Sequence, residues 1–162
     1  MATQAVRQPE GRVRQVGKVV TQVTITNHAD EILAARGFLD ANSIRSVTLD
    51  EVLVDTGATT LCLPADIIAA LGLPRGAGID IDIETAPGRS QASLYDDAKV
   101  TLQGRSATFE CVELPVGAPP LLGVFPLERL GVELDLQNQR LRLLPDTGPD
   151  TYFLAPSPQV IR

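Results

Sequence analysis

An ionisable residue lies between two apolar segments in the stretch EVLVDTGATTLCLP, residues 51–64. Asp55 directly follows four strand-like residues, and the chain becomes apolar again shortly after it. A carboxylate in an apolar environment is costly unless it is hydrogen-bonded or protonated. The fold must therefore supply partners for Asp55, or use it in a turn where its side chain caps its own backbone.

The composition is that of an ordinary globular protein of one domain, with 44% hydrophobic and 21% charged residues among 162. The net charge of -6 argues against a nucleic-acid or anionic-membrane surface as a partner. The uncharged run LPVGAPPLLGVFPL contains prolines and is too short to span a bilayer. The N-terminus lacks the apolar core of a secretion signal, so we expect a cytoplasmic protein.

Histidine and cysteine are too scarce for several kinds of site. The single histidine, His28, argues against histidine-based triads within one subunit and against zinc sites, which need several ligands at close spacing. Cys62 and Cys111 both lie in apolar strand-like segments, where a free cysteine behaves as a small hydrophobe. We expect no metal, no organic cofactor and no disulfide, and chemistry based on carboxylates or hydroxyls.

Most of the chain is predicted to form strands. We expect a flexible arm over residues 1–16, one folded domain over 17–144 and an extended tail over 145–162. In KVVTQVTIT, Val19, Thr21, Val23 and Ile25 alternate with a more polar face. Further strands are expected at 31–40 and 47–55, in a hairpin that begins with IDIDIE, and in hairpins around 103–105 and 137–139.

Two short helices are expected, and they follow the same rules. LPADIIAALGLP places Pro64 in the first helical turn, three apolar residues on one face and Gly72 at the end. FPLERLG repeats this order with Pro126 and Gly131. Each helix follows an apolar strand and a glycine-containing turn, which indicates a faint internal duplication.

LVDTGAT followed by LLG, with Gly123 66 residues after Gly57 (123 - 57 = 66), resembles the retroviral-type aspartic proteases over residues 18–144. The resemblance implies an all-β, retropepsin-like fold, a closed barrel-like single lobe with short helices, acting as a symmetric homodimer. It implies an aspartic endopeptidase for peptide or protein substrates.

The resemblance also assigns roles to individual residues. Asp55 would be catalytic, Thr56 and Gly57 would support its loop, and Leu121 and Leu122 would form an inner strand behind the loop, with Gly123 leaving room for the neighbouring chain. Ala58 and Thr59 would border the substrate groove. The tip of a flap that closes over bound peptide would be formed by Ala86, Pro87 and Gly88.

Peptide hydrolysis by carboxylates alone needs two of them, one to deprotonate water and one to protonate the carbonyl oxygen or the leaving nitrogen. One DTG loop supplies one carboxylate, and a two-fold axis between two loops would bring Asp55 next to its copy. Because like charges about 3 Å apart cannot both ionise cheaply, the pair should share a proton.

Two alternatives stay open on the sequence. A dimeric peptide-binding or scaffold protein could retain this fold without cleaving. A monomeric domain could use Asp55 only to shape a turn. A second DTG, at Asp146, lies between two prolines with 14 residues after Gly148 (162 - 148 = 14), so it leaves no room for a second lobe and is predicted to be a surface turn.

Overall fold

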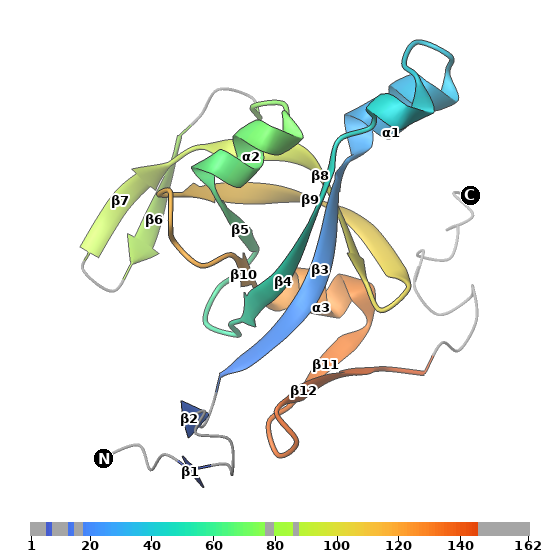
Figure 1. The fold of residues 1–162 in the computed structure, drawn as a ribbon. Helices are drawn as coiled ribbons and strands as arrows, with labels where there is room; N and C mark the ends of the chain where they lie inside the picture. Colours follow the sequence, from blue (N-terminus) through green and yellow to red (C-terminus); the bar gives the residue numbers. More distant parts are fainter. Residues whose placement is uncertain (1–5, 8–12, 15–17, 77–79, 86–87, 146–162) are drawn as a thin grey trace, which may run out of the picture.

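The computed structural model describes residues 6–7, 13–14, 18–76, 80–85 and 88–145. Six strands form a closed barrel in the order β10-β4-β3-β8-β9-β5, with short helices and three two-stranded sheets around it (Figure 1). This mostly β architecture confirms the predicted fold class. The elements are β1 (Val6–Arg7), β2 (Val13–Arg14), β3 (Val19–Asn27), α1 (His28–Ala35), the 3-10 turn Ala41–Ser43, β4 (Ser46–Val54), β5 (Leu61–Pro64), α2 (Ala65–Leu71), β6 (Ile81–Thr85), β7 (Gly88–Ala92), β8 (Leu94–Leu102), β9 (Arg105–Leu114), β10 (Leu121–Leu122), α3 (Val124–Leu130), β11 (Val132–Asp135) and β12 (Arg140–Leu143).

The barrel core follows from the alternation of the strands. On β3, Val19, Val23 and Ile25 are buried, whereas Val20 is 53% exposed, as the period of two predicts. Buried apolar residues of β4, β5 and β8 join the same core cluster, together with buried residues of α2 and α3. Within the described residues, no helix is long and apolar enough to cross a membrane.

Four neighbouring strands of the barrel wall are arranged as two similar parallel pairs. β10 runs parallel to β4, and β5 runs parallel to β9, while β5 and β10 pair antiparallel between them. Each of the two short strands, β5 and β10, leads into a helix, α2 and α3 respectively. The predicted duplication therefore includes the strand pairing as well as the sequence pattern of the two helices.

Both predicted helices are confirmed, and each ends at the expected glycine. Gly72 and Gly131 adopt left-handed conformations with φ of 59° and 63°, which a residue without a Cβ adopts at little cost. Ile68 and Leu71 of α2 are buried and Ile67 packs against the core, as the sequence pattern predicted.

The strand predicted over residues 31–40 is wrong, because helix α1 occupies His28–Ala35. The Asn27 side chain accepts a hydrogen bond from the Asp30 backbone N–H at 3.0 Å and so caps the helix. The buried Asp30 carboxylate also accepts three hydrogen bonds from Arg45, at 2.8 to 3.0 Å. These local and long-range polar contacts stabilise the helix, and they outweigh the weak strand-like alternation of the segment.

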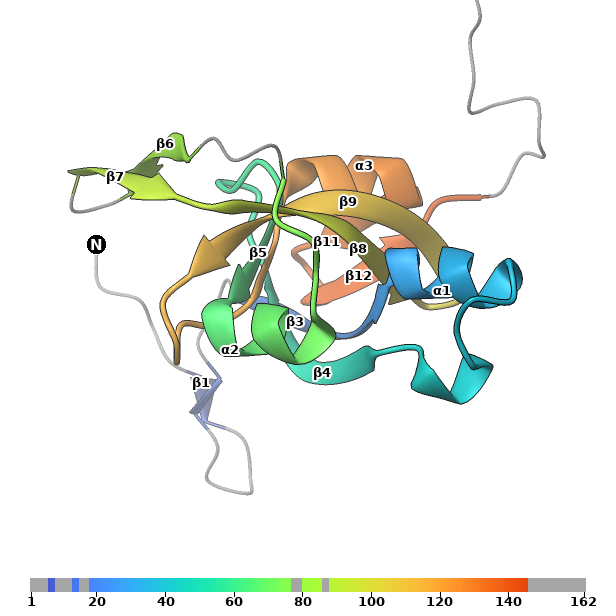
Figure 2. The ribbon, with the colours of Figure 1, turned by 90° about the horizontal axis from the view of Figure 1, so that it is seen from above.

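The predicted hairpins β8–β9 and β11–β12 are confirmed. β6 and β7 form the hairpin expected at the flap, and its described residues project from the barrel on the side away from α1 (Figure 2). The predicted tip residues Ala86 and Pro87 lie outside the described residues, as do Asp146 to Gly148 of the second DTG. The boundaries of the arm and the tail stay predictions.

Candidate active site

Asp55 begins a tight turn directly after β4. Its backbone N–H donates to the Leu122 carbonyl at 3.1 Å, and the Ala58 N–H closes the turn on the Asp55 carbonyl at 3.1 Å. The Gly57 N–H donates to Asp55 Oδ1 at 2.8 Å. The half-buried carboxylate is thus oriented by its own loop, and in the described part of the chain no other hydrogen bond to it is found.

The loop after Asp55 rests on the start of α3. Gly123 N–H donates to the Thr60 carbonyl at 3.1 Å, and the Val124 and Phe125 N–H groups donate to Ala58 and Thr59 at 3.0 Å each. A Cβ on Gly123 would lie 2.6 Å from both the Ala58 and the Thr60 carbonyl oxygens. The chain for which Gly123 leaves room is therefore the Asp55 loop of the same molecule.

The predicted site residues of this loop are brought together, and they face outward. Thr56, Gly57 and Thr59 are exposed, and Ala58 is partly exposed. A surface of exposed loop backbone beside a half-buried carboxylate is open to a substrate or to a second subunit. The supporting role expected for Thr56 stays a prediction.

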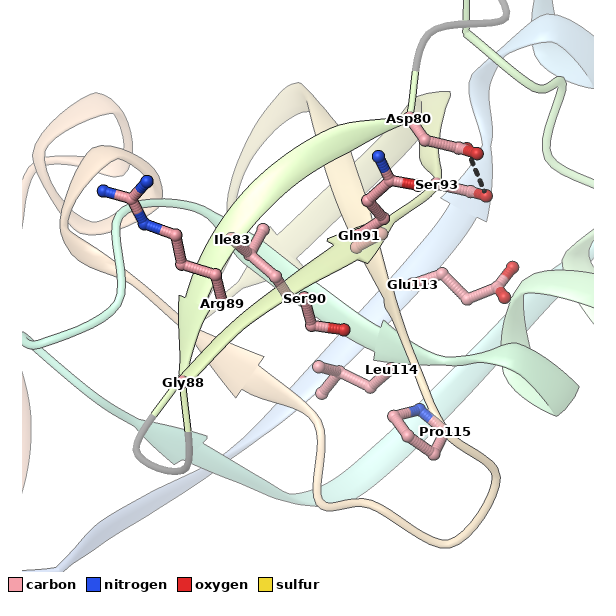
Figure 3. Close-up of a pocket in the computed structure, with 11 residues that line it drawn as sticks. Asp80, Ile83, Gly88, Arg89, Ser90, Gln91, Ser93, Glu113, Leu114 and Pro115 are labelled. Atoms are coloured by element: carbon pink, nitrogen blue, oxygen red, sulfur yellow. Dashed lines mark hydrogen bonds between the residues drawn. The ribbon is translucent and has the colours of Figure 1, made fainter.

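A cavity of about 570 Å³ lies beside the β6–β7 hairpin, between it and the end of β9 (Figure 3). Of the predicted flap residues, Gly88 lines it. The polar residues of this cavity were not predicted from the sequence, in which a carboxylate within the apolar strand CVELP is the one signal of them. Its lining is Asp80, Ile83, Gly88, Arg89, Ser90, Gln91, Ala92, Ser93, Glu113, Leu114 and Pro115.

A polar network holds one wall of this cavity. Arg75 Nη2 donates to Asp80 Oδ1 at 2.9 Å and to Ser93 Oγ at 3.1 Å, and Ser93 Oγ donates to Asp80 at 3.0 Å. The hydrogen bonds from Ser93 and Arg75 lower the pKa of Asp80. Asp80 is therefore an anion that is already neutralised by its own neighbours.

The two cysteines differ in their relation to the Asp55 loop. Cys62 Sγ lies 3.9 Å from the Thr60 carbonyl oxygen, and burial, followed by the negative charge of Asp55, raises its pKa. Burial raises the pKa of Cys111 to about 12. Both are free thiols. Among the described residues, no group of three or more histidine, cysteine or acidic side chains is placed to hold a metal ion.

Comparison with known proteins identifies the class. A family model described as "gag-polyprotein putative aspartyl protease" matches residues 43–129, just over half of the chain. The chain belongs to this retropepsin-like aspartyl protease family. Among solved structures it is similar to EIAV protease complexed with the inhibitor HBY-793, at 19% identity and a TM-score of 0.46, over 70% of this chain and 88% of the other. A comparison with curated proteins gave no match.

Proposed function

We propose that the protein is an aspartic endopeptidase that acts as a symmetric homodimer, with one Asp55 from each subunit. The observation that carries the proposal is the Asp55 turn, in which a half-buried carboxylate is oriented by the Gly57 N–H and surrounded by exposed loop residues. Membership of the aspartyl protease family supports the same reading. Because the chain supplies this carboxylate once, a second subunit has to provide the other.

In the proposed reaction the two copies of Asp55 share one proton. The ionised carboxylate takes a proton from a water molecule, and the resulting hydroxide attacks the peptide carbonyl carbon. The protonated carboxylic acid gives its proton to the carbonyl oxygen. Collapse of the tetrahedral intermediate then breaks the C–N bond as the leaving nitrogen is protonated, with no covalent acyl-enzyme.

The proposed substrate is an extended peptide. The β6–β7 hairpin forms a two-stranded sheet of its own and projects from the barrel, which is the form of a lid over a bound strand. Such a peptide would lie between the hairpin and the Asp55 loop of each subunit. We expect apolar side chains beside the scissile bond.

The test is the substitution Asp55→Asn, which keeps the size of the side chain and removes its acid-base chemistry. We expect peptide cleavage to fall by at least about 10³-fold, since a general acid-base pair contributes up to about 10⁴-fold. The matched control is Asp50→Asn, at an exposed position on β4 where the carboxylate accepts a hydrogen bond from Gln22. Equal cleavage by the parent and the Asp55→Asn protein would overturn the proposal.

The dimer is tested separately by sedimentation. Ionising both copies of Asp55 sets two negative charges against each other, so we expect association to weaken as pH rises from acidic to mildly alkaline values. Asp55→Asn should flatten this dependence. A protein that stays monomeric at micromolar concentration across this range would favour the simple turn role for Asp55.

A further inference from the structure

The cavity beside the β6–β7 hairpin combines apolar walls with two carboxylates, those of Asp80 and Glu113. Ile83, Leu114 and Pro115 supply apolar lining, and Glu113 lines the cavity from β9 (Figure 3). A volume of about 570 Å³ is within the range of small-ligand pockets. It can therefore accept one long side chain of a bound peptide.

The charges in the cavity leave Glu113 available to a ligand. Within the described residues no Lys, Arg or His lies at ion-pair distance from Glu113, in contrast to Asp80, which is paired with Arg75 at 2.9 Å. The interaction that is found for Glu113 is with the Tyr95 hydroxyl, whose pKa it raises. A hydroxyl donates one hydrogen bond and does not neutralise the charge.

Arg89 lines the same cavity but does not neutralise Glu113. Its side chain is 81% exposed, and its Nε lies 3.6 Å from Glu84 Oε1 on the neighbouring strand. Figure 3 shows the Arg89 guanidinium and the Glu113 carboxylate on opposite sides of the cavity. A cation that enters from solvent therefore meets the Glu113 carboxylate without displacing a salt bridge.

The position of Glu113 along β9 relates the cavity to the Asp55 loop. Thr60 Oγ1 donates to the Glu110 carbonyl at 3.3 Å, so the loop touches β9 at residue 110. Glu113 is three residues further (113 - 110 = 3), which is about 10 Å along a strand. An extended peptide covers the same length in about three residues.

We propose that Glu113 selects peptide substrates carrying a lysine or arginine within a few residues of the scissile bond, with the aliphatic stem against the apolar wall and the cationic head at the carboxylate. This rests on the proposed function. In a symmetric dimer the cavity occurs twice, so the preference applies on both sides of the scissile bond.

The experiment uses fluorescent peptides that differ only in lysine, norleucine or glutamate at each position. Binding is measured on the Asp55→Asn protein and cleavage on the parent. Lysine should be preferred over norleucine by about tenfold at one position within a few residues of the scissile bond, as expected for a charge-assisted hydrogen bond in a partly buried site. Glu113→Gln, whose amide oxygen can still accept from Tyr95, should reduce this preference to below about twofold. Glu110→Gln, exposed on the same strand, should retain it.

The outcomes separate the two proposals. Equal binding of lysine and norleucine peptides, or an unchanged lysine preference in Glu113→Gln, overturns the role of Glu113 even if the parent cleaves. Lysine-selective binding that Glu113→Gln removes, without cleavage by the parent, supports Glu113 and overturns the protease. Peptides that neither bind nor are cleaved overturn both.

Discussion

The barrel wall contains two similar halves, β4–β5–α2 and β9–β10–α3, which have the same backbone plan and different chemistry. VLVDTGATTL at 52–61 and VELPVGAPPL at 112–121 align with an offset of 60 (112 - 52 = 60) and share a valine, a glycine, an alanine and a leucine at equivalent positions. Each loop is closed by the same kind of hydrogen bond, from Ala58 to Asp55 and from Ala118 to Pro115, at 3.1 Å in both. Each half also places one strand parallel to a strand of the other.

The difference is that the first loop carries a carboxylate where the second carries a proline. Pro115 has no side chain that can exchange a proton, and Pro119 and Pro120 stand where the first loop has Thr59 and Thr60. The second half instead supplies Gly123, which leaves space for the first loop. Geometry is thus duplicated within the chain and acid-base chemistry is not, which is why the proposed mechanism needs a second molecule.

The largest effect is expected at Gly123. Gly123→Ala would place a Cβ 2.6 to 2.7 Å from three backbone atoms of the first loop, which cannot move as a flexible side chain can. We expect a loss of about 3 kcal/mol or more in the free energy of unfolding, measured by urea denaturation.

The matched control for Gly123→Ala is Gly117→Ala in the second loop. Gly117 has a φ of 85° and open space around its Cβ position, so only backbone strain applies, at about 1 kcal/mol. Equal losses of stability for the two variants would show that the contact between residue 123 and the first loop tolerates a Cβ.

The next prediction concerns the side chains that bind the C-terminal ends of α2 and α3. The buried Asn27 donates to the Leu71 and Gly72 carbonyls at 2.9 and 3.2 Å, and also caps α1. Arg105 does the corresponding work for α3 by donating to Leu130 and Gly131 from a half-buried position. We expect Asn27→Ala to cost about 2 kcal/mol and Arg105→Met about 1 kcal/mol.

Urea denaturation of both variants measures this difference. Thr108→Ala, at an exposed position on β9, serves as a control that should stay near the parent. A larger loss for Arg105→Met than for Asn27→Ala would show that burial does not decide the importance of these caps.

These caps also mark what the sequence could and could not predict. Period-two strands, helix-ending glycines and the DTG turn depend on neighbouring residues, and all were predictable. The Asn27 contact with Leu71 spans 44 residues, and the Asp30–Arg45 contact that accompanies α1 spans 15, so no local pattern reveals them. Glu113 escaped for the same reason, because its cavity is completed by a hairpin more than 20 residues earlier.

A smaller effect is expected on the stability in acid, and it concerns Asp30 in the first turn of α1. The Arg45 hydrogen bond is the largest cause that lowers the pKa of Asp30 from 3.8. The folded state therefore binds this proton less readily than the unfolded chain, so the stabilisation is present above about pH 4 and is lost as pH falls through the lowered pKa. The groups that Arg105 binds are neutral carbonyls, which do not titrate.

Urea denaturation of the parent and Asp30→Asn at pH 7 and at about pH 2 tests this. The stability advantage of the parent should fall by about half or more in acid. An advantage that is independent of pH would mean that packing, rather than the charge of Asp30, accounts for it.

The smallest effect reports on Asp55 itself through Cys62. The negative charge of Asp55 contributes to the raised pKa of this thiol, so Asp55→Asn should lower that pKa and increase the fraction of reactive thiolate. We expect alkylation by iodoacetamide at pH 8 to speed up by about two- to fivefold. Cys111, with a pKa of about 12 in the interior, is the internal control and should stay unreactive in both proteins. Peptide mapping by mass spectrometry gives both rates in one sample. An unchanged Cys62 rate would mean that the Asp55 side chain does not act on the thiol as an anion.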